Sequence, residues 1–133
     1  MRDPTSKPRP LIGVVEDDLA VLHSLEFALQ AEGYAVWPFQ NAEDASACAD
    51  LLEADCVVLD YALPGTTGLD LLRSLRRRGM SCPAIVIASN PSAQCRRESH
   101  AADAPLIEKP LMGEDLSSGI RAALAASAVR NAG

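Results

Sequence analysis

The first half of this 133-residue chain lacks positive charge. No lysine or arginine occurs between Pro10 and Leu72, whereas twelve aspartates and glutamates fall in that stretch. A nucleic-acid-binding surface needs clustered basic residues, so their absence argues against one. The net charge of −6, with its acids concentrated in the first half, instead indicates a domain that holds a cation there.

The sequence also lacks the patterns of several other protein classes. No two of its four cysteines have C-x-x-C spacing, and its two histidines form no zinc pattern with them. We expect buried free thiols in a reducing cytoplasm, with a disulfide as the minor alternative. No run approaches the ~18–20 apolar residues that span a bilayer, and Met1–Pro10 does not resemble a signal peptide. The sequence therefore predicts a cytoplasmic protein without a membrane partner.

Length and composition favour one globular domain. Hydrophobic residues make up 48% and charged residues 23% of the chain, close to the usual values for globular proteins. The chain length fits the ~100–200 residues of a typical domain. We expect a flexible tail at 1–10, a folded domain at 11–130 and a short tail at 131–133.

Short apolar runs alternate with helical patterns along the chain. The expected strands are Leu11–Val15, Ala35–Phe39, Cys56–Asp60, Ala84–Ala88 and Leu106–Glu108. The expected helices cover about 21–32, 41–52, 69–78, 92–102 and 114–129. This alternation predicts an α/β fold, in which a doubly wound five-stranded parallel sheet is joined by right-handed crossovers through five helices.

Charged side chains stand where several of these strands end. Glu16 and Asp17 follow the first strand, Asp60 ends the third and Lys109 follows the fifth. The carboxyl ends of parallel strands meet at one edge of the sheet, where such folds place their sites. Crowded carboxylates favour a cation, and Mg²⁺ prefers such ligands together with a phosphate. Asp60 could then attack phosphorus to form an aspartyl phosphate, while Lys109 balances the added charge.

The motifs GVVEDD, LDYALPGTTGLDLL, PAIVIAS and IEKP together resemble the receiver (response-regulator) domain of bacterial two-component signalling. The resemblance covers about residues 11–129 and implies a flavodoxin-like receiver fold. It implies that Asp60 is the phospho-acceptor and that Asp17 is a direct Mg²⁺ ligand. Glu16 matches the acidic neighbour that usually acts through water, and the backbone carbonyl of Ala62 matches a third protein ligand.

The same resemblance implies the remaining parts of the site and its partners. Lys109 matches the lysine that contacts the phosphoryl group, and Pro110 would follow a cis peptide bond that helps to aim it. The phosphoryl group would come from a sensor histidine kinase or a phosphotransfer protein. The output would pass to a downstream protein through the fourth helix, fifth strand and fifth helix. Self-phosphotransfer and slow self-dephosphorylation would be the only chemistry.

Two positions depart from the family pattern. Ala88 stands where the family has the Thr or Ser that bonds the phosphoryl group, and Ser89 lies one residue later. Leu106 stands where the family often has the Tyr or Phe that turns inward on activation. A hydrogen bond to a charged partner contributes ~1.5–3 kcal/mol, so its loss would remove much of the bias towards an active state. We expect phosphotransfer to be preserved better than switching.

Three functions remain open on this reading. The first is a phospho-accepting module whose output, with no second domain after residue 133, is an interaction with a protein, a relay or a phosphate sink. If the sequence is part of a longer regulator, an effector domain is a further alternative. The second is a degenerate receiver that acts as a phosphorylation-insensitive interaction domain, favoured by Ala88 and Leu106. The third is a Mg²⁺-dependent phosphohydrolase, disfavoured because Ala62 stands where such enzymes carry a second acid.

Overall fold

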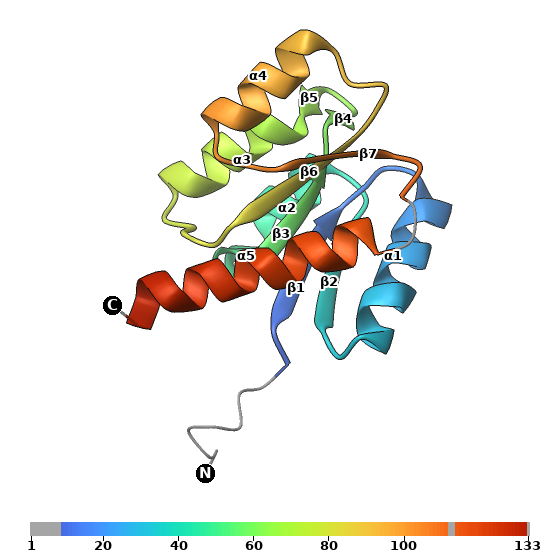
Figure 1. Ribbon diagram of the computed structural model, residues 1–133. Helices are drawn as coiled ribbons and strands as arrows, with labels where there is room; N and C mark the ends of the chain where they lie inside the picture. The colour runs from blue at the N-terminus through green and yellow to red at the C-terminus, as the bar shows by residue number, and fades with distance from the viewer. Residues whose placement is uncertain (1–8, 112–113, 133) are drawn as a thin grey trace.

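A parallel sheet with the strand order β2-β1-β3-β6-β7 forms the centre of the molecule (Figure 1). The computed structural model describes residues 9–111 and 114–132. Its main strands are β1 (Leu11–Val15), β2 (Ala35–Phe39), β3 (Cys56–Asp60), β6 (Ala84–Ser89) and β7 (Leu106–Lys109). Its α-helices are α1 (Leu19–Ala31), α2 (Ala42–Ala47), α3 (Gly68–Arg77), α4 (Ala93–Ala101) and α5 (Asp115–Ala132). The expected five-stranded, doubly wound α/β fold is confirmed.

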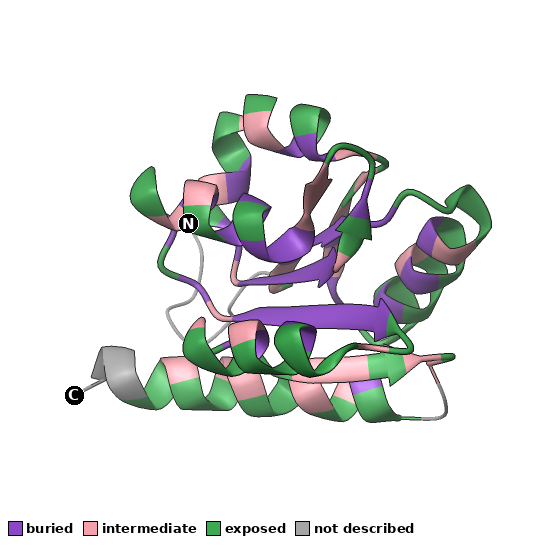
Figure 2. Cartoon of the chain, turned by 90° about the horizontal axis from the view of Figure 1, so that it is seen from above, coloured by how far each residue is buried: buried purple, intermediate pink, exposed green. Residues whose placement is uncertain are grey.

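Helices cover both faces of the sheet, which explains why its central strands β1, β3 and β6 are mainly apolar and buried. Residues of α1 and α5 pack on one face, and residues of α2 and α3 pack on the other. Within β3, Cys56 and Val58 point to the α1/α5 side, whereas Val57 and Leu59 point to the α2/α3 side. Figure 2 shows the buried strands between helices whose outward faces are exposed. Such double burial is typical of parallel sheets.

The second expected helix is interrupted. We expected one helix over 41–52, but α2 ends at Ala47 and a separate 3₁₀ helix, η1 (Ala49–Glu53), follows. Cys48 between them has an extended backbone, with φ −90° and ψ 99°. The break brings Leu51 into the core, where it is fully buried. Tertiary packing therefore overrides the local helical pattern here.

The loop after β3 contains a small hairpin that the sequence did not predict. Two-residue strands, β4 (Ala62–Leu63) and β5 (Thr66–Thr67), pair antiparallel, and Gly65 between them has a φ of +78°. Thr67 then caps α3 by accepting a hydrogen bond from the Asp70 N–H at 3.1 Å. The hairpin therefore leads the chain directly from the end of β3 into α3.

Three elements in the second half of the chain are slightly longer than the sequence predicts. The expected tail at 1–10 lies largely outside the described residues, as does Gly133. α5 continues to Ala132, three residues beyond the expected end. β6 reaches Ser89 and β7 reaches Lys109, each one residue longer than expected. No helix in the described part of the chain is long and apolar enough to cross a membrane.

The four cysteines are free thiols. Cys56, Cys82 and Cys95 are buried and Cys48 is half-buried. Burial raises the pKa of Cys56 to about 12 and that of Cys82 to about 11. The buried thiols therefore contribute to packing as small apolar groups, and Cys56 and Cys82 remain protonated.

Candidate functional site

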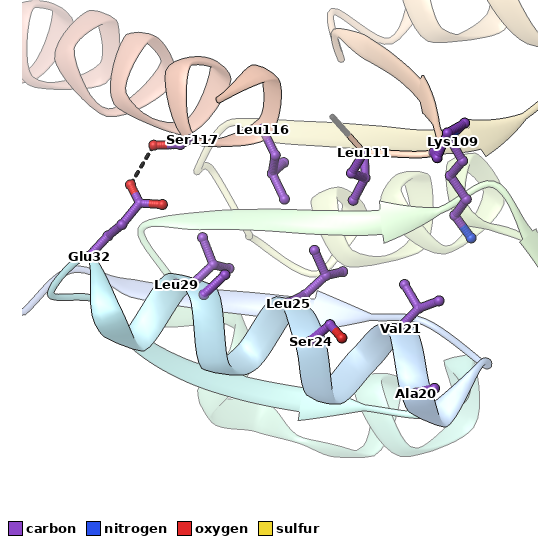
Figure 3. A pocket seen from close by; sticks show the side chains of 12 residues that line it. Ala20, Val21, Ser24, Leu25, Leu29, Glu32, Lys109, Leu111, Leu116 and Ser117 are labelled. Atoms are coloured by element: carbon purple, nitrogen blue, oxygen red, sulfur yellow. Dashed lines mark hydrogen bonds between the residues drawn. The ribbon is translucent and has the colours of Figure 1, made fainter. Parts of the chain in front are cut away.

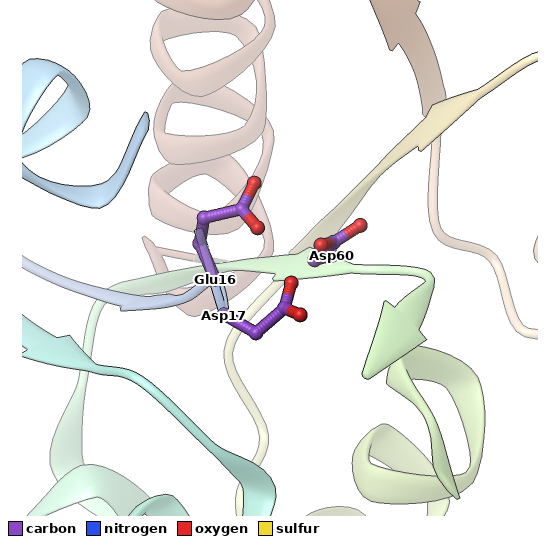
Figure 4. Close-up of side chains that lie close together, drawn as sticks. All are labelled: Glu16, Asp17 and Asp60. Atoms are coloured by element: carbon purple, nitrogen blue, oxygen red, sulfur yellow. The ribbon is translucent and has the colours of Figure 1, made fainter. Parts of the chain in front are cut away.

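Three carboxylates converge at the carboxyl edge of the sheet. Glu16 and Asp17 follow β1, and Asp60 ends the neighbouring strand β3. One oxygen from each of these side chains lies within 4.8 Å of the others. Figure 4 shows the three side chains lying close together at the two strand ends. The predicted gathering of acids is therefore present in the structure.

The three acids differ in their exposure to solvent. Glu16 is fully buried and Asp60 is only 4% exposed, whereas Asp17 is exposed. Glu16 accepts a hydrogen bond from the Asp18 N–H at 3.1 Å, which fixes one of its oxygens. Asp18 itself caps α1 by accepting from the Ala20 N–H at 3.0 Å. Of the three acids after β1, Glu16 and Asp17 therefore belong to the acid cluster, and Asp18 caps α1.

Lys109 supplies the positive charge of the site. Its Nζ donates to Glu16 Oε1 at 2.6 Å and lies 3.4 Å from Asp60 Oδ2. Lys109 ends β7, and the peptide bond that joins it to Pro110 is cis, as the sequence predicts. The ammonium group therefore bridges the two buried carboxylates.

The electrostatics of the cluster distinguish its members. Burial, and then the neighbouring Glu16 carboxylate, raise the pKa of Asp60 to about 7, although Lys109 opposes this. Burial acts to raise the pKa of Glu16, but hydrogen bonds with Asp60, Lys109 and the Asp18 N–H outweigh it and leave the pKa lowered. Burial also disfavours the charge of Lys109, but Glu16 and Asp60 outweigh it and raise its pKa. Of the two buried acids, Asp60 is therefore the one whose ionised form is disfavoured.

This donor set suits a hard divalent cation. Carboxylate and carbonyl oxygens are the ligands that Mg²⁺ prefers, and a second positive charge would relieve the crowding that raises the pKa of Asp60. Glu16, Asp17, Asp60 and Ala62 all line one cleft of about 380 Å³. The residues present therefore fit the Mg²⁺ ion that the sequence predicts.

The cleft also contains the positions that depart from the family pattern. Ala88 is buried near the end of β6 and lines the cleft without offering a hydroxyl group. Ser89 lines the same cleft, is exposed and stands in register with Lys109. Leu106 does not line this cleft; it is half-buried and lies beside α4. The structure therefore brings together every predicted site residue except Leu106 and Pro110.

Sequence reasoning missed Tyr61. This residue lines the cleft directly after Asp60, and its hydroxyl donates to Glu98 Oε1 of α4 at 2.9 Å. Its adjacency to Asp60 was a visible signal, but its partner lies 37 residues away in the chain. Only the tertiary structure identifies this contact.

A larger hollow elsewhere is a weaker candidate for chemistry. A groove of about 450 Å³ lies between α1 and α5, with Lys109 at one end (Figure 3). Its walls include Val21, Leu25, Leu29 and Leu116, and a hydrogen bond from Ser117 to Glu32 links the two helices. The groove lacks the convergent charged groups of the acid cleft, so we assign the functional site to the cleft.

Comparison with known proteins identifies the family. Residues 12–121 match the model of the response regulator receiver domain. The chain is 35% identical over 112 residues to the two-component response regulator PhoP of Pseudomonas aeruginosa, covering 84% of this chain and 50% of that protein. It is 34% identical over 120 residues to the transcriptional regulatory protein FixJ of Azorhizobium caulinodans, covering 88% of this chain and 56% of that protein. The chain thus spans about half the length of these relatives.

Solved structures agree with this match. The crystal structure of FixJ-N has a TM-score of 0.78 and 30% identity, covering 94% of this chain and 96% of that one. The CheY-like receiver domain protein from Methanospirillum hungatei has a TM-score of 0.83 and 26% identity, covering 92% and 98% of the two chains. The likeness extends over almost the whole of each solved domain.

Proposed function

Because the chain belongs to the response regulator receiver domain family, a signalling family of bacterial two-component systems, we propose that Asp60 accepts a phosphoryl group from a histidine kinase or a phosphotransfer protein. The observation that carries this proposal is the convergence of Glu16, Asp17 and Asp60 within 4.8 Å, with Lys109 3.4 Å from Asp60. A nucleophilic carboxylate, two further acids and one ammonium group are the parts that this chemistry requires.

The proposed reaction is a transfer between two covalent carriers. A carboxylate oxygen of Asp60 attacks phosphorus of the donor phosphohistidine, and an O–P bond forms as the N–P bond breaks. The donor imidazole keeps the electron pair of the broken bond and takes up a proton. Lys109, which already lies 3.4 Å from Asp60, balances the negative charge that arrives with the phosphoryl group.

We propose that Mg²⁺ occupies the acid cluster during this transfer. Asp17 and Asp60 would hold it directly with the backbone carbonyl of Ala62, and Glu16 would act through water. When bound, the ion supplies positive charge to the phosphoryl oxygens. The raised pKa of Asp60 supports this role, since the ionised acceptor needs a cation beside it.

We propose Ser89 as the phosphoryl contact that replaces the missing hydroxyl at Ala88. Ser89 lines the cleft and is in register with Lys109, whereas Ala88 offers only a methyl group. Replacing Ser89 by alanine should therefore reduce the rate of phosphorylation or the lifetime of the adduct. An unchanged rate and lifetime in Ser89→Ala would remove this role and leave the site without a hydroxyl contact.

Intact mass spectrometry tests the central proposal. Incubation with Mg²⁺ and acetyl phosphate should add the mass of one phosphoryl group, about 80 Da, to the protein. The adduct should disappear in Asp60→Asn and diminish strongly in Asp17→Asn. Asp18→Asn is the matched control, because Asn also caps helices and Asp18 accepts the capping hydrogen bonds of α1. An adduct that persists in Asp60→Asn would refute the assignment of the acceptor.

A second candidate function follows from the two altered positions. Ala88 supplies no hydroxyl and Leu106 supplies no aromatic ring, so the chain could act as a phosphorylation-insensitive interaction domain. The same mass experiment separates the two functions, since this alternative predicts that no adduct forms on the wild-type protein. Self-phosphotransfer and slow self-dephosphorylation would be the only reactions of the first function.

We propose that the module acts in the cytoplasm. Its four free cysteines support this location, because thiols stay reduced there. Its downstream partner would bind the surface formed by α4, β7 and α5. The absence of a nucleic-acid partner stays a prediction, because two-component relatives of this chain include a protein named as a transcriptional regulator. Gel-shift experiments with the longest natural form of the protein would test it.

A further inference from the structure

Tyr61 connects the acid cleft to α4. It directly follows Asp60, and its hydroxyl donates to Glu98 Oε1 at 2.9 Å. Of the residues that line the cleft within the described ranges, Tyr61 is the one whose side chain hydrogen-bonds to α4. A change in the cleft can therefore reach α4 through this side chain.

The backbone of Tyr61 is fixed on both sides. Its N–H donates to the Ile87 carbonyl of β6 at 2.8 Å, and its own carbonyl accepts from the Gly68 N–H of α3 at 2.8 Å. The peptide that carries the acceptor is therefore held between a central strand and a helix. When the charge in the cleft changes, we therefore expect the ring and hydroxyl of Tyr61 to move and its backbone to stay in place.

Glu98 receives a second, weaker contact. Its other carboxylate oxygen lies 3.7 Å from Arg73 Nη2, and Arg73 is 2.5 Å from Asp70 on its own helix. An exposed arginine shared between two carboxylates contributes little to stability. A hydroxyl that donates to a carboxylate forms a stronger bond, so Tyr61 is the main polar tie on this side of α4.

The other polar contacts of α4 lie away from the cleft: Arg96 is 3.4 Å from Glu108 of β7, and Arg76 of α3 donates to the Ala102 carbonyl at the C-cap. The buried residues of α4 are Cys95 and Ser99, and the Ser99 hydroxyl is buried without a hydrogen-bond partner in the described structure. A hollow of about 280 Å³ lies between α4 and β7, with Leu106 in its wall. Helices with sparse burial are the ones that open at low free-energy cost. The Tyr61–Glu98 bond is therefore the polar contact that ties this sparsely buried helix to the cleft.

We propose that the Tyr61–Glu98 hydrogen bond is a latch on α4 and that a phosphoryl group on Asp60 releases it. The inference rests on the proposed function, since it needs charge to arrive at Asp60. A phosphoryl group carries about −1.5 to −2 charges and strong acceptor oxygens, which compete for the Tyr61 hydroxyl and repel the Glu98 carboxylate. Tyr61 would thus carry the response that Ala88 and Leu106 are not equipped to carry.

Hydrogen exchange of α4 amides tests the latch, with beryllofluoride and Mg²⁺ as the phosphoryl mimic. In the wild type, the mimic should speed exchange in α4 by roughly 10- to 150-fold, the effect expected from losing one charge-assisted hydrogen bond. Tyr61→Phe should exchange at this faster rate without the mimic and respond little to it. Tyr34→Phe is the matched control, since it removes the other tyrosine hydroxyl of the chain and should behave as the wild type does.

A second variant separates charge from hydrogen bonding. Glu98→Gln keeps an acceptor for Tyr61 but carries no charge, so α4 should start protected and loosen less than in the wild type. Equal exchange of α4 in the wild type and Tyr61→Phe, with and without the mimic, would overturn the latch even if acetyl phosphate modifies Asp60. If neither reagent acts on Asp60, the proposed function fails first, and the latch fails with it.

Discussion

Burial makes the ionised form of Asp60 costly at neutral pH. Its pKa is raised to about 7 in the folded protein, against an ordinary value of 3.8. Between these values Asp60 binds more protons in the native state than in the unfolded state, so its contribution to stability falls as pH rises from about 4 to about 7. Glu16, whose pKa is lowered, acts in the opposite direction, but only as pH falls below its ordinary value of 4.5.

Asp60→Asn should therefore stabilise the metal-free protein above pH 7. A neutral amide removes the buried charge and can still donate to Glu16, so we expect a gain of about 1–4 kcal/mol at pH 8, with one pKa unit equal to ~1.4 kcal/mol. At pH 4 the gain should vanish. Urea denaturation of both proteins in EDTA across this pH range measures the difference in stability, and a difference that stays constant from pH 4 to pH 8 would contradict the raised pKa.

Ala88 offers a direct test of what its missing hydroxyl contributes. Ala88→Thr should restore a donor to the phosphoryl oxygens and increase the affinity for beryllofluoride by roughly 10- to 150-fold, because a hydrogen bond to a charged group contributes ~1.5–3 kcal/mol. Ala88→Val matches threonine in shape without the hydroxyl and should show no gain. Titration calorimetry with Mg²⁺ present measures the affinities, and equal values for the two variants would assign the effect to packing.

At the scale of elements, the start of α3 is built around the acceptor strand. Gly68 begins this helix, and its N–H donates to the Tyr61 carbonyl at 2.8 Å. A methyl group at Gly68 would overlap the Asp60 carbonyl oxygen and lie 3.1 Å from its carbonyl carbon. The absence of a side chain therefore allows α3 to pack against the residue that carries the acceptor.

Gly68→Ala should consequently displace Asp60. We expect a loss of about 1–3 kcal/mol in stability, as in other overpacked sites, together with slower phosphorylation by acetyl phosphate. Gly119→Ala is the matched control: its added methyl would meet Ile107 and Ile85 at 3.4 Å, an ordinary contact distance. That change should stabilise α5 by roughly 0.5–1 kcal/mol. Thermal unfolding of both variants would contradict this account if Gly68→Ala were the more stable.

The hydrophobic periodicity and the turn or charged residues between apolar runs predicted most helices and strands, because the sheet is buried on both faces. The apolar run of β3 predicts its bounds, Cys56–Asp60, since charged or turn residues flank it. The acid cluster could be predicted for the same reason, as parallel strands end together. The break at Cys48 and the β4–β5 hairpin could not, because packing of Leu51 and pairing of Ala62 with Thr67 decide them. Tyr61–Glu98 depends on tertiary contact in the same way.

At the scale of the whole molecule, the acid cluster links metal binding to folding. An ion that binds only the native state stabilises it by mass action, by about 1.4 kcal/mol at ten times its dissociation constant. We therefore expect Mg²⁺ to raise the melting temperature by about 2–6 °C for a chain of this size. Asp17→Asn should abolish the rise and Asp18→Asn should retain it. A rise of equal size in Asp17→Asn would place the ion elsewhere.

The buried cysteines also allow unfolding of the chain to be followed by chemical modification of their thiols. Cys56, Cys82 and Cys95 lie inside the fold, while Cys48 is partly accessible. Alkylating reagents attack thiolates that they can reach. In a timed pulse of such a reagent, Cys48 would be modified first, and the other three would be modified only in molecules that have transiently unfolded. Peptide mapping of the alkylated sites would thus give the lifetime of the native state without any added label.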